Sequence, residues 1–400
     1  MSTNKMDFSQ RNVAIDILRA LTMLVMIFVN DFWTIKEVPK WMQHARGNED
    51  FLGLADTIFP IFLFMVGMSI PFAIERRYSK GFSDVSTLGH ILARSFALLM
   101  LGVFTESFDA LGRIGMSSHV YRTVAIVALF MVWNVYPKTD KKTLRHVFTA
   151  LQIIGILILV YLAFIFRTRN DGYLTAGYWG ILGLIGWTYL VCVIAYLFTR
   201  DNVMKVFWVW LVFVVLCAIK SGSYIPREAN IINDLLNATH LGTPGHNALT
   251  MGGALFSLMI VKYSSVETRK KVLFLVGAVV ALLIASRVTN LFWIMSKNRA
   301  TLPCVFACMG IAIGFYGLIQ WAVSKGGAKW FNIIKAGGTA TLSCYVIAYL
   351  VYAVFWGYLN FSLPVWMKTG TYGLIKSVLF AFLCIGVTAL LEKCKIKLKI

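Results

Sequence analysis

Residues 53–74 of the 400-residue chain read GLADTIFPIFLFMVGMSIPFAI, and this stretch decides the fold class. Asp56 is its only ionisable residue, and the run is long enough to cross the hydrocarbon core of a bilayer as a helix. Comparable apolar runs recur along the whole chain. The runs that we expect to span the membrane cover residues 13–33, 53–74, 88–107, 120–136, 147–166, 177–199, 203–219, 246–262, 272–295, 302–323, 338–360 and 372–391.

The composition places nearly all of the chain in lipid. Hydrophobic residues make up 58% of the sequence, charged residues only 14%, and mean hydropathy is +0.73. We therefore predict an all-α polytopic transmembrane bundle of about twelve spans that forms a single domain over residues 1–400. Because Lys and Arg are more frequent in the loops that share a side with the N-terminus, we expect both termini in the cytoplasm.

The net charge of +20 is dispersed over short loops, with no basic helix that would suit nucleic acid. Anionic lipid headgroups explain most of it, although some cytoplasmic arginines could instead receive a phosphorylated cofactor. The seven cysteines lie in or beside apolar runs, without ligands at metal-binding spacing. We expect neither a metal nor a disulfide framework, and we interpret the first apolar run as a retained signal anchor.

Ionisable groups at membrane depth are costly, so each is a candidate functional residue. Asp16 and Arg19 are three residues apart near the start of the first run. They could form a structural ion pair or contact a cofactor. Glu106 and Asp109, also three apart, could be a carboxylate pair for acid and base chemistry or simply a solvated helix end.

Four polar groups should lie at the outer ends of the first two runs. Asn30 and Asp31 close the first run, His44 lies in the loop that follows, and Asp56 opens the second run. A helical hairpin would let them converge. Histidine suits proton transfer near neutrality and a carboxylate fixes its tautomer, although a loop histidine can also be merely solvated.

The long loop over residues 221–245 is rich in groups that can hydrogen-bond or stack, as a carbohydrate site requires. Any extracellular loop is polar, so this signal is unspecific. The residues concerned are Tyr224, Arg227, Glu228, Asn230, Asn233, Asp234 and Asn237.

The N-terminal third carries a specific pattern of residues. It reads RNVAIDILRAL at 11–21, MIFVN at 26–30, His44, ADTIFPIFLFMVGMSI at 55–70 and ARSF at 93–96. In order and spacing this pattern resembles the heparan-alpha-glucosaminide N-acetyltransferase family and its bacterial membrane relatives. The resemblance implies a transmembrane enzyme that takes acetyl from cytoplasmic acetyl-CoA and delivers it to an amino sugar or cell-envelope glycan across the membrane.

The resemblance also implies roles for individual residues. His44 would be the general base or a transient acetyl carrier, Asn30 would support the thioester oxygen, and Asp56 would orient the imidazole. Cytoplasmic arginines would hold the CoA phosphates. The residues expected to bind acetyl-CoA are Asp16, Arg19, Arg76, Arg77, Arg94, Arg122 and Lys297.

The resemblance suggests a division of the chain. Residues 1–136 match the family best, 147–219 would contain an inserted pair of spans added to a ten-span core, and 246–391 would form the C-terminal spans. The chain departs from the family pattern at four positions: Tyr121, Pro244, Gly245 and Ala340.

We expect an integral protein of the bacterial inner membrane, in contact with membrane lipids, with a homodimer as the candidate assembly. Two other functions remain open from the sequence. A secondary transporter or flippase would also have about twelve spans, but residues 1–200 and 201–400 show no clear internal repeat. A catalytically silent relative would bind ligand only.

Overall fold

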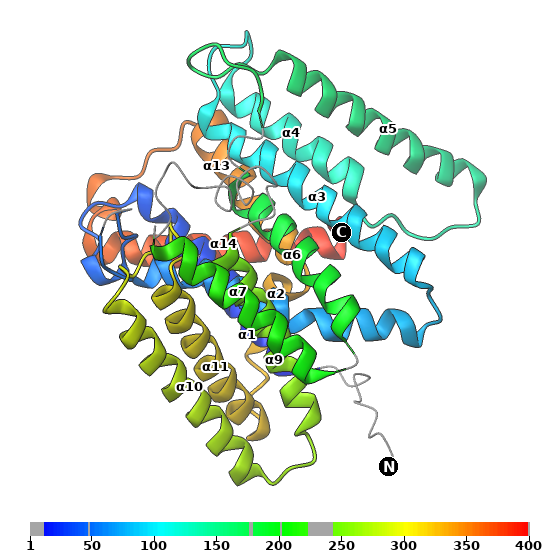
Figure 1. Cartoon of the computed structure of the whole chain (residues 1–400). Coiled ribbons are helices and arrows are strands. Elements are labelled where there is room, and N and C mark those ends of the chain that lie inside the picture. Colours follow the sequence, from blue (N-terminus) through cyan, green and yellow to red (C-terminus); the bar gives the residue numbers. More distant parts are fainter. Residues whose placement is uncertain (1–11, 47–48, 176–178, 201, 223–242, 399–400) are drawn as a thin grey trace, which may run out of the picture. The chain divides into compact units, whose positions relative to one another are not determined.

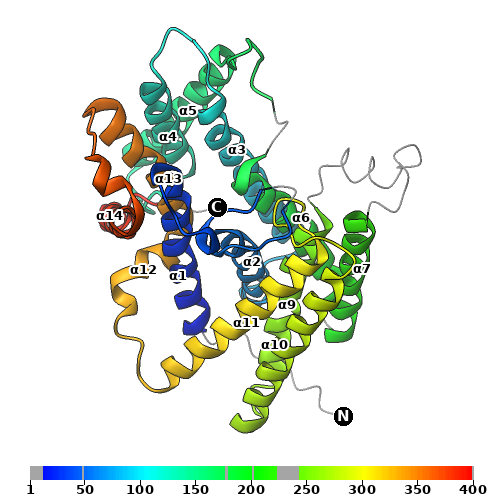
Figure 2. The same cartoon turned by 90° about the vertical axis from the view of Figure 1, so that its left-hand side faces the viewer.

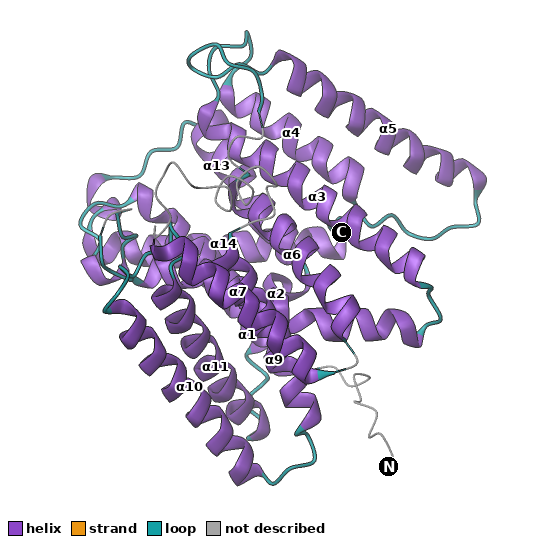
Figure 3. Ribbon diagram, viewed as in Figure 1, coloured by secondary structure: helices purple, strands orange, loops and turns teal. Residues whose placement is uncertain are grey.

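The computed structural model describes residues 12–46, 49–175, 179–200, 202–222 and 243–398. Figure 3 shows that these residues form helices and connecting loops, and no strand occurs among them. The polar loop residues from Tyr224 to Asn237 lie outside the described ranges, so the carbohydrate-site prediction for that loop stays a prediction.

The described helices are numbered in chain order (Figure 1). They are α1 (Val13–Asn30), α2 (Leu54–Ser79), α3 (Asp84–Ala110), α4 (Ser118–Trp133), α5 (Lys142–Ile165), α6 (Gly180–Thr199), α7 (Val203–Gly222), α9 (Pro244–Lys262), α10 (Thr268–Asn290), α11 (Leu302–Ser324), α12 (Phe331–Thr339), α13 (Thr341–Tyr352) and α14 (Gly370–Lys393). The described residues also form four short helical turns: η1 (Asp31–Thr34), η2 (Lys40–Met42), η4 (Ala353–Tyr358) and η5 (Val365–Lys368).

The prediction of a polytopic helical membrane protein is confirmed. Each predicted apolar run coincides with a helix, and 10 helices of the described chain are long and apolar enough to cross a membrane. Two of the predicted runs form helices that are not long enough or not apolar enough to be counted among these candidate spans. α4 has only 16 residues, and α9 carries polar and glycine residues but is buried by protein along most of its length, which removes the need for a lipid-compatible surface.

The chain divides into two compact units built from discontinuous segments. Unit 1 comprises Met1–Thr22, Pro39–Ser95 and Ile185–Phe331, and unit 2 comprises Met23–Val38, Phe96–Leu184 and Asn332–Ile400. Helices α1, α3 and α6 each contribute residues to both.

In unit 1, helices α2 and α9 pack against each other through small residues. A Cβ on Gly67 would lie 1.8 Å from the Thr250 carbonyl oxygen, and one on Gly253 would lie 1.9 Å from the Phe64 carbonyl oxygen. The Ser257 hydroxyl donates to the Met68 carbonyl at 2.8 Å. Small residues allow such close backbone approach, which is how helices associate in membranes.

The helices around this pair show which surfaces meet lipid. α7 and α11 contact α9, and α10 runs beside α11 (Figures 1 and 2). α10 is the least buried candidate span, because only 6% of its most apolar 18-residue stretch is buried. Its Leu273 is 71% exposed. Exposed apolar side chains on a spanning helix are suited to contact with acyl chains.

In unit 2, α4 packs with α5, and α13 packs with α14. α5 is largely uncovered by protein, and its exposed residues include Leu157, Val160 and Phe164. The π-helical turn η4 continues α13, so that these two segments together form one candidate span over Thr341–Tyr358.

Candidate functional site

The first turn of α2 is organised by Asp56, whose carboxylate is 1% exposed. Its Oδ2 accepts hydrogen bonds from the backbone N–H of Ala45 at 2.7 Å and of Gly53 at 3.3 Å. A Cβ on Gly53 would lie 1.9 Å from the Gln43 carbonyl oxygen, so only glycine fits there. The loop before α2 therefore folds back over the helix start and is tied to it by one buried carboxylate.

His44 lies in this loop with its Nδ1 3.0 Å from Asp56 Oδ1. A carboxylate can only accept, so Nδ1 carries the proton and donates it to this hydrogen bond. The other nitrogen, Nε2, is then an acceptor without a partner among the described residues, on a side chain that is 45% exposed. This arrangement presents a base whose tautomer is fixed, as general base catalysis requires.

Lys297 completes a group that we call the histidine cluster: His44, Asp56 and Lys297. Its Nζ lies 3.7 Å from Asp56 Oδ1 and 3.4 Å from His44 Nδ1. Since Nδ1 already donates to Asp56, we assign the lysine contact mainly to the carboxylate. The resemblance alone pointed to Lys297, as a ligand of acetyl-CoA, and that role stays a prediction; the structure places Lys297 beside the candidate base.

Asp50 positions the segment that carries Lys297, and sequence reasoning missed it. Its Oδ1 accepts from the backbone N–H of Met295 at 2.6 Å and from Asn290 Nδ2 at 3.0 Å. This exposed carboxylate therefore joins the loop before α2 to the segment between α10 and α11. Nothing in the local sequence marks a contact between residues 240 positions apart.

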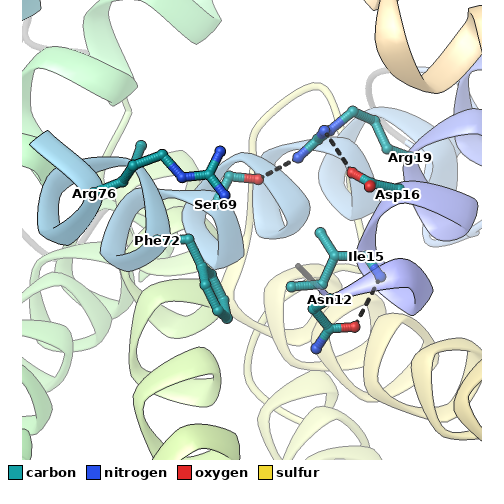
Figure 4. Close-up of a pocket in the computed structure, with 8 residues that line it drawn as sticks. Asn12, Ile15, Asp16, Arg19, Ser69, Phe72 and Arg76 are labelled. Atoms are coloured by element: carbon teal, nitrogen blue, oxygen red, sulfur yellow. Dashed lines mark hydrogen bonds and ion pairs between the residues drawn. The ribbon is translucent and has the colours of Figure 1, made fainter. Parts of the chain in front are cut away.

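A cavity of about 320 Å³ lies at the other end of α2 (Figure 4). Arg19 reaches across it, with NH2 2.5 Å from the Ser69 hydroxyl and NH1 3.4 Å from Asp16 Oδ1. The Arg76 side chain flanks the same space. The lining residues are Asn12, Ile15, Asp16, Arg19, Ser69, Phe72, Ala73 and Arg76.

The cavity and the histidine cluster lie at opposite ends of one helix. Asp56 is in the first turn of α2 and Arg76 is in the last. Twenty residues at 1.5 Å per residue separate them by roughly 30 Å along the axis, about the thickness of a hydrocarbon core. Three predicted cofactor residues, Asp16, Arg19 and Arg76, thus share one cavity a membrane's thickness from His44.

The other predicted cofactor residues lie elsewhere. The Arg77 NH2 donates to the Ser86 carbonyl at 3.2 Å, and the Arg94 guanidinium lies over the Tyr189 ring at 4.5 Å. Arg122 belongs to unit 2, where its NH2 donates to the Phe108 carbonyl at 2.9 Å. Their roles in cofactor binding stay predictions.

Asn30 and Asp31 also belong to unit 2. Asn30 ends α1 and is partly buried. Asp31, which is 1% exposed, accepts from the Tyr352 hydroxyl at 2.6 Å and also binds Lys376 and Ser377. Lys376 in turn donates to the Thr34 hydroxyl at 2.5 Å. We call Asp31, Thr34, Tyr352, Lys376 and Ser377 the aspartate cluster; sequence analysis singled out only Asp31 from it.

The remaining carboxylates of interest are on α3. Asp109 Oδ1 lies 3.3 Å from Arg122 NH2, which makes it a partner in an ion pair. Glu106 lines a separate cavity of about 350 Å³ in unit 2, together with Asp109 and Tyr173. Among the described residues, no group of three or more His, Cys, Asp or Glu side chains is placed to hold a metal ion.

The departures from the family pattern occupy structural positions. Tyr121 is fully buried in α4, and Ala340 directly precedes α13. Pro244 takes the first position of α9, which suits a residue without an N–H. Gly245 passes so close to the next segment that a Cβ would lie 2.2 Å from the Ala300 carbonyl oxygen.

Comparison with known proteins shows a family for this chain. A family model described as a domain of unknown function (DUF5009) matches residues 11–236, more than half of the chain. The chain belongs to the DUF5009 family. The match includes α1 and α2 and with them the cavity, His44 and Asp56, while Lys297 lies beyond it.

This DUF5009 protein is also a relative of heparan-alpha-glucosaminide N-acetyltransferases. It is 30% identical to the Mus musculus enzyme over 138 residues, which cover 31% of this chain and 20% of the relative. It is 33% identical to the Homo sapiens enzyme over 94 residues, which cover 22% of this chain and 13% of the relative. The chain thus matches at most a fifth of the length of these relatives.

Proposed function

We propose that this protein is a membrane acetyltransferase that moves acetyl from cytoplasmic acetyl-CoA to an amino sugar or glycan on the other side. The observation that carries the proposal is the His44–Asp56 pair, in which a buried carboxylate holds Nδ1 and leaves Nε2 open as a base. The names of the two enzymes to which the chain is similar supply the reaction class and the type of acceptor.

The chemistry needs one base and one acyl donor. His44 Nε2 removes a proton from the acceptor amine, whose nitrogen attacks the thioester carbonyl carbon. The carbon–sulfur bond then breaks, and the departing CoA thiolate takes the proton from His44. The products are the N-acetylated acceptor and CoA thiol. If acetyl first rests on His44, the same atoms are exchanged in two steps.

Asp56 and Lys297 set the electrostatics of this base. The carboxylate fixes the imidazole and stabilises the imidazolium that forms when Nε2 takes a proton. Lys297 contributes a third charge, with its Nζ 3.7 Å from that carboxylate. It also places positive charge where a thioester oxygen would become negative.

The cavity at the far end of α2 is our candidate for the polar part of acetyl-CoA. Arginine recognises phosphate through parallel N–H donors, and Arg19 and Arg76 both face this cavity. With the N-terminus inside, this end of α2 is cytoplasmic and His44 lies outside. The acyl arm would then enter the bundle while the phosphates stay at the cytoplasmic surface. We expect the protein in a bacterial inner membrane.

The experiment uses purified protein in detergent, acetyl-CoA labelled in the acetyl group, and glucosamine as acceptor. We expect label in N-acetylglucosamine with the wild type and a loss of at least about 10³-fold with His44→Ala. His146→Ala, a matched change at an exposed histidine on α5, should retain wild-type activity. Transfer that persists in His44→Ala would refute the assigned base, and sugar uptake into vesicles without acetyl-CoA would favour a transporter.

A further inference from the structure

His246 is a buried histidine that the proposed reaction does not yet use. It lies in the first turn of α9 and is 6% exposed. Its Nδ1 has neither solvent contact nor a hydrogen-bond partner among the described residues. Buried polar atoms are nearly always paired and an unpaired one is destabilising, so this atom requires an explanation.

The start of α9 satisfies the backbone N–H of His246 without using the imidazole. Thr243 caps the helix, and its hydroxyl accepts from the His246 backbone N–H at 3.4 Å. Pro244 provides the first helical residue and Gly245 allows the close pass against Ala300. The backbone donor of His246 is thereby satisfied locally, and the side chain is left facing the interior of unit 1.

One ring contact and the charge of a nearby lysine relate this side chain to the histidine cluster. The His246 ring packs edge-on against the Phe59 ring, with centroids 5.3 Å apart. Phe59 follows Asp56 by three residues on α2, so both lie on the same helix face, one turn apart. Lys297, which contacts both His44 and Asp56, also acts electrostatically on His246.

The surroundings of His246 favour an oxygen that bears negative charge. The N-terminus of a helix carries a partial positive charge, and α9 is 19 residues long. Lys220, in the last turn of α7, adds its charge to that of Lys297. A neutral imidazole with a proton on Nδ1 would then be a buried donor, in a positive environment, with no acceptor of its own.

We propose that His246 is a further catalytic residue, whose Nδ1–H donates a hydrogen bond to the acyl oxygen of the thioester as negative charge develops there. This inference rests on the proposed acetyl transfer. The acceptor nitrogen adds to the carbonyl carbon, the carbonyl electron pair moves to the oxygen, and His246 keeps its proton throughout. The pair returns as the carbon–sulfur bond breaks and CoA thiol leaves.

The test separates a catalytic role from a structural one with His246→Phe. The change removes the unpaired nitrogen and keeps a ring against Phe59, so thermal stability in detergent should equal or exceed that of the wild type. The kcat for acetylation of glucosamine should fall about 10²-fold, with KM for glucosamine unchanged. His246→Gln, which keeps a donor, should recover part of the lost kcat.

Tyr196→Phe is the matched control, because the Tyr196 hydroxyl is also buried and unpaired but lies in the core beside α7 and α9. Its kcat should not change. Wild-type kcat in His246→Phe, or a loss of kcat that follows a loss of folded protein in both His246 variants, would overturn the inference alone. A wild type that neither acetylates glucosamine nor releases CoA would refute the proposed function and this inference together.

Discussion

The histidine cluster and the aspartate cluster contain the same kinds of groups but differ in how they use them. Each has a carboxylate that is 1% exposed and a lysine beside it. In the aspartate cluster the carboxylate binds Lys376, Ser377 and Tyr352, and the lysine also binds Thr34. In the histidine cluster one partner of the carboxylate is an imidazole that is 45% exposed, and its second nitrogen has no partner among the described residues.

From this difference we infer which buried carboxylate takes part in the proposed reaction and which one stabilises the fold. A polar group whose hydrogen-bond partners all lie within the protein has no donor or acceptor available for a substrate. Removing one residue of such a cluster leaves the others unpaired. A group that is half satisfied and half exposed can bind or transfer a proton. We therefore assign chemistry to His44 and its neighbours, and packing to Asp31 and its neighbours.

Asp56→Asn should have the largest effect on activity. An asparagine whose oxygen still accepts from the Ala45 N–H would turn its NH2 toward His44 Nδ1 and force the proton onto Nε2. The base would then be blocked, and we expect kcat to fall about 10³-fold to 10⁴-fold. Acetyl transfer from labelled acetyl-CoA measures this. Near wild-type kcat in a folded Asp56→Asn protein would contradict the chemical role assigned to the histidine cluster.

Asp31→Asn should act on stability instead. It leaves Lys376, which is only 14% exposed, without its counter-ion, and removing one partner of a buried ion pair costs about 3–5 kcal/mol. We expect a lower melting temperature in detergent and less protein in the membrane. The double change Asp31→Asn with Lys376→Met should recover stability. A stable Asp31→Asn protein that has lost only kcat would reverse the two assignments.

Arg76→Ala should have the smallest effect, and it tests whether the cavity serves the histidine cluster. Loss of one charged contact to phosphate should raise KM for acetyl-CoA about tenfold, with kcat unchanged. The neighbouring change Arg77→Ala provides the comparison, because the Arg77 side chain contacts Ser86 outside the cavity lining. An equal rise in KM for acetyl-CoA in both variants would indicate that the arginines act through long-range charge and not through contacts in the cavity.

Most of the fold follows from sequence because spanning helices are encoded locally. A run such as residues 302–323 contains its whole signal, namely length and apolarity, and it becomes α11 at Leu302–Ser324. α9 shows the limit of this signal, because a helix surrounded by protein can carry His246, Asn247 and several glycines. Its burial depends on the helices around it, which hydropathy does not report.

The candidate site was predictable only where its residues are near one another in the chain. His44 and Asp56 are 12 residues apart, and a hairpin between two spans was enough to expect their contact. Lys297 is 253 residues from His44, and it was found through resemblance, with a different role. The link between Asp31 and Lys376 spans 345 residues, and no spacing or composition indicates it.

The glycine contacts between α2 and α9 limit the route that an acyl group can take. On that face of α2, Gly67 and Gly253 bring the two backbones so close that neither water nor a substrate chain can pass between them. Ser69, Phe72 and Ala73 instead line the cavity shared with α1. A carrier arm bound in this cavity therefore cannot leave it through the contact between α2 and α9.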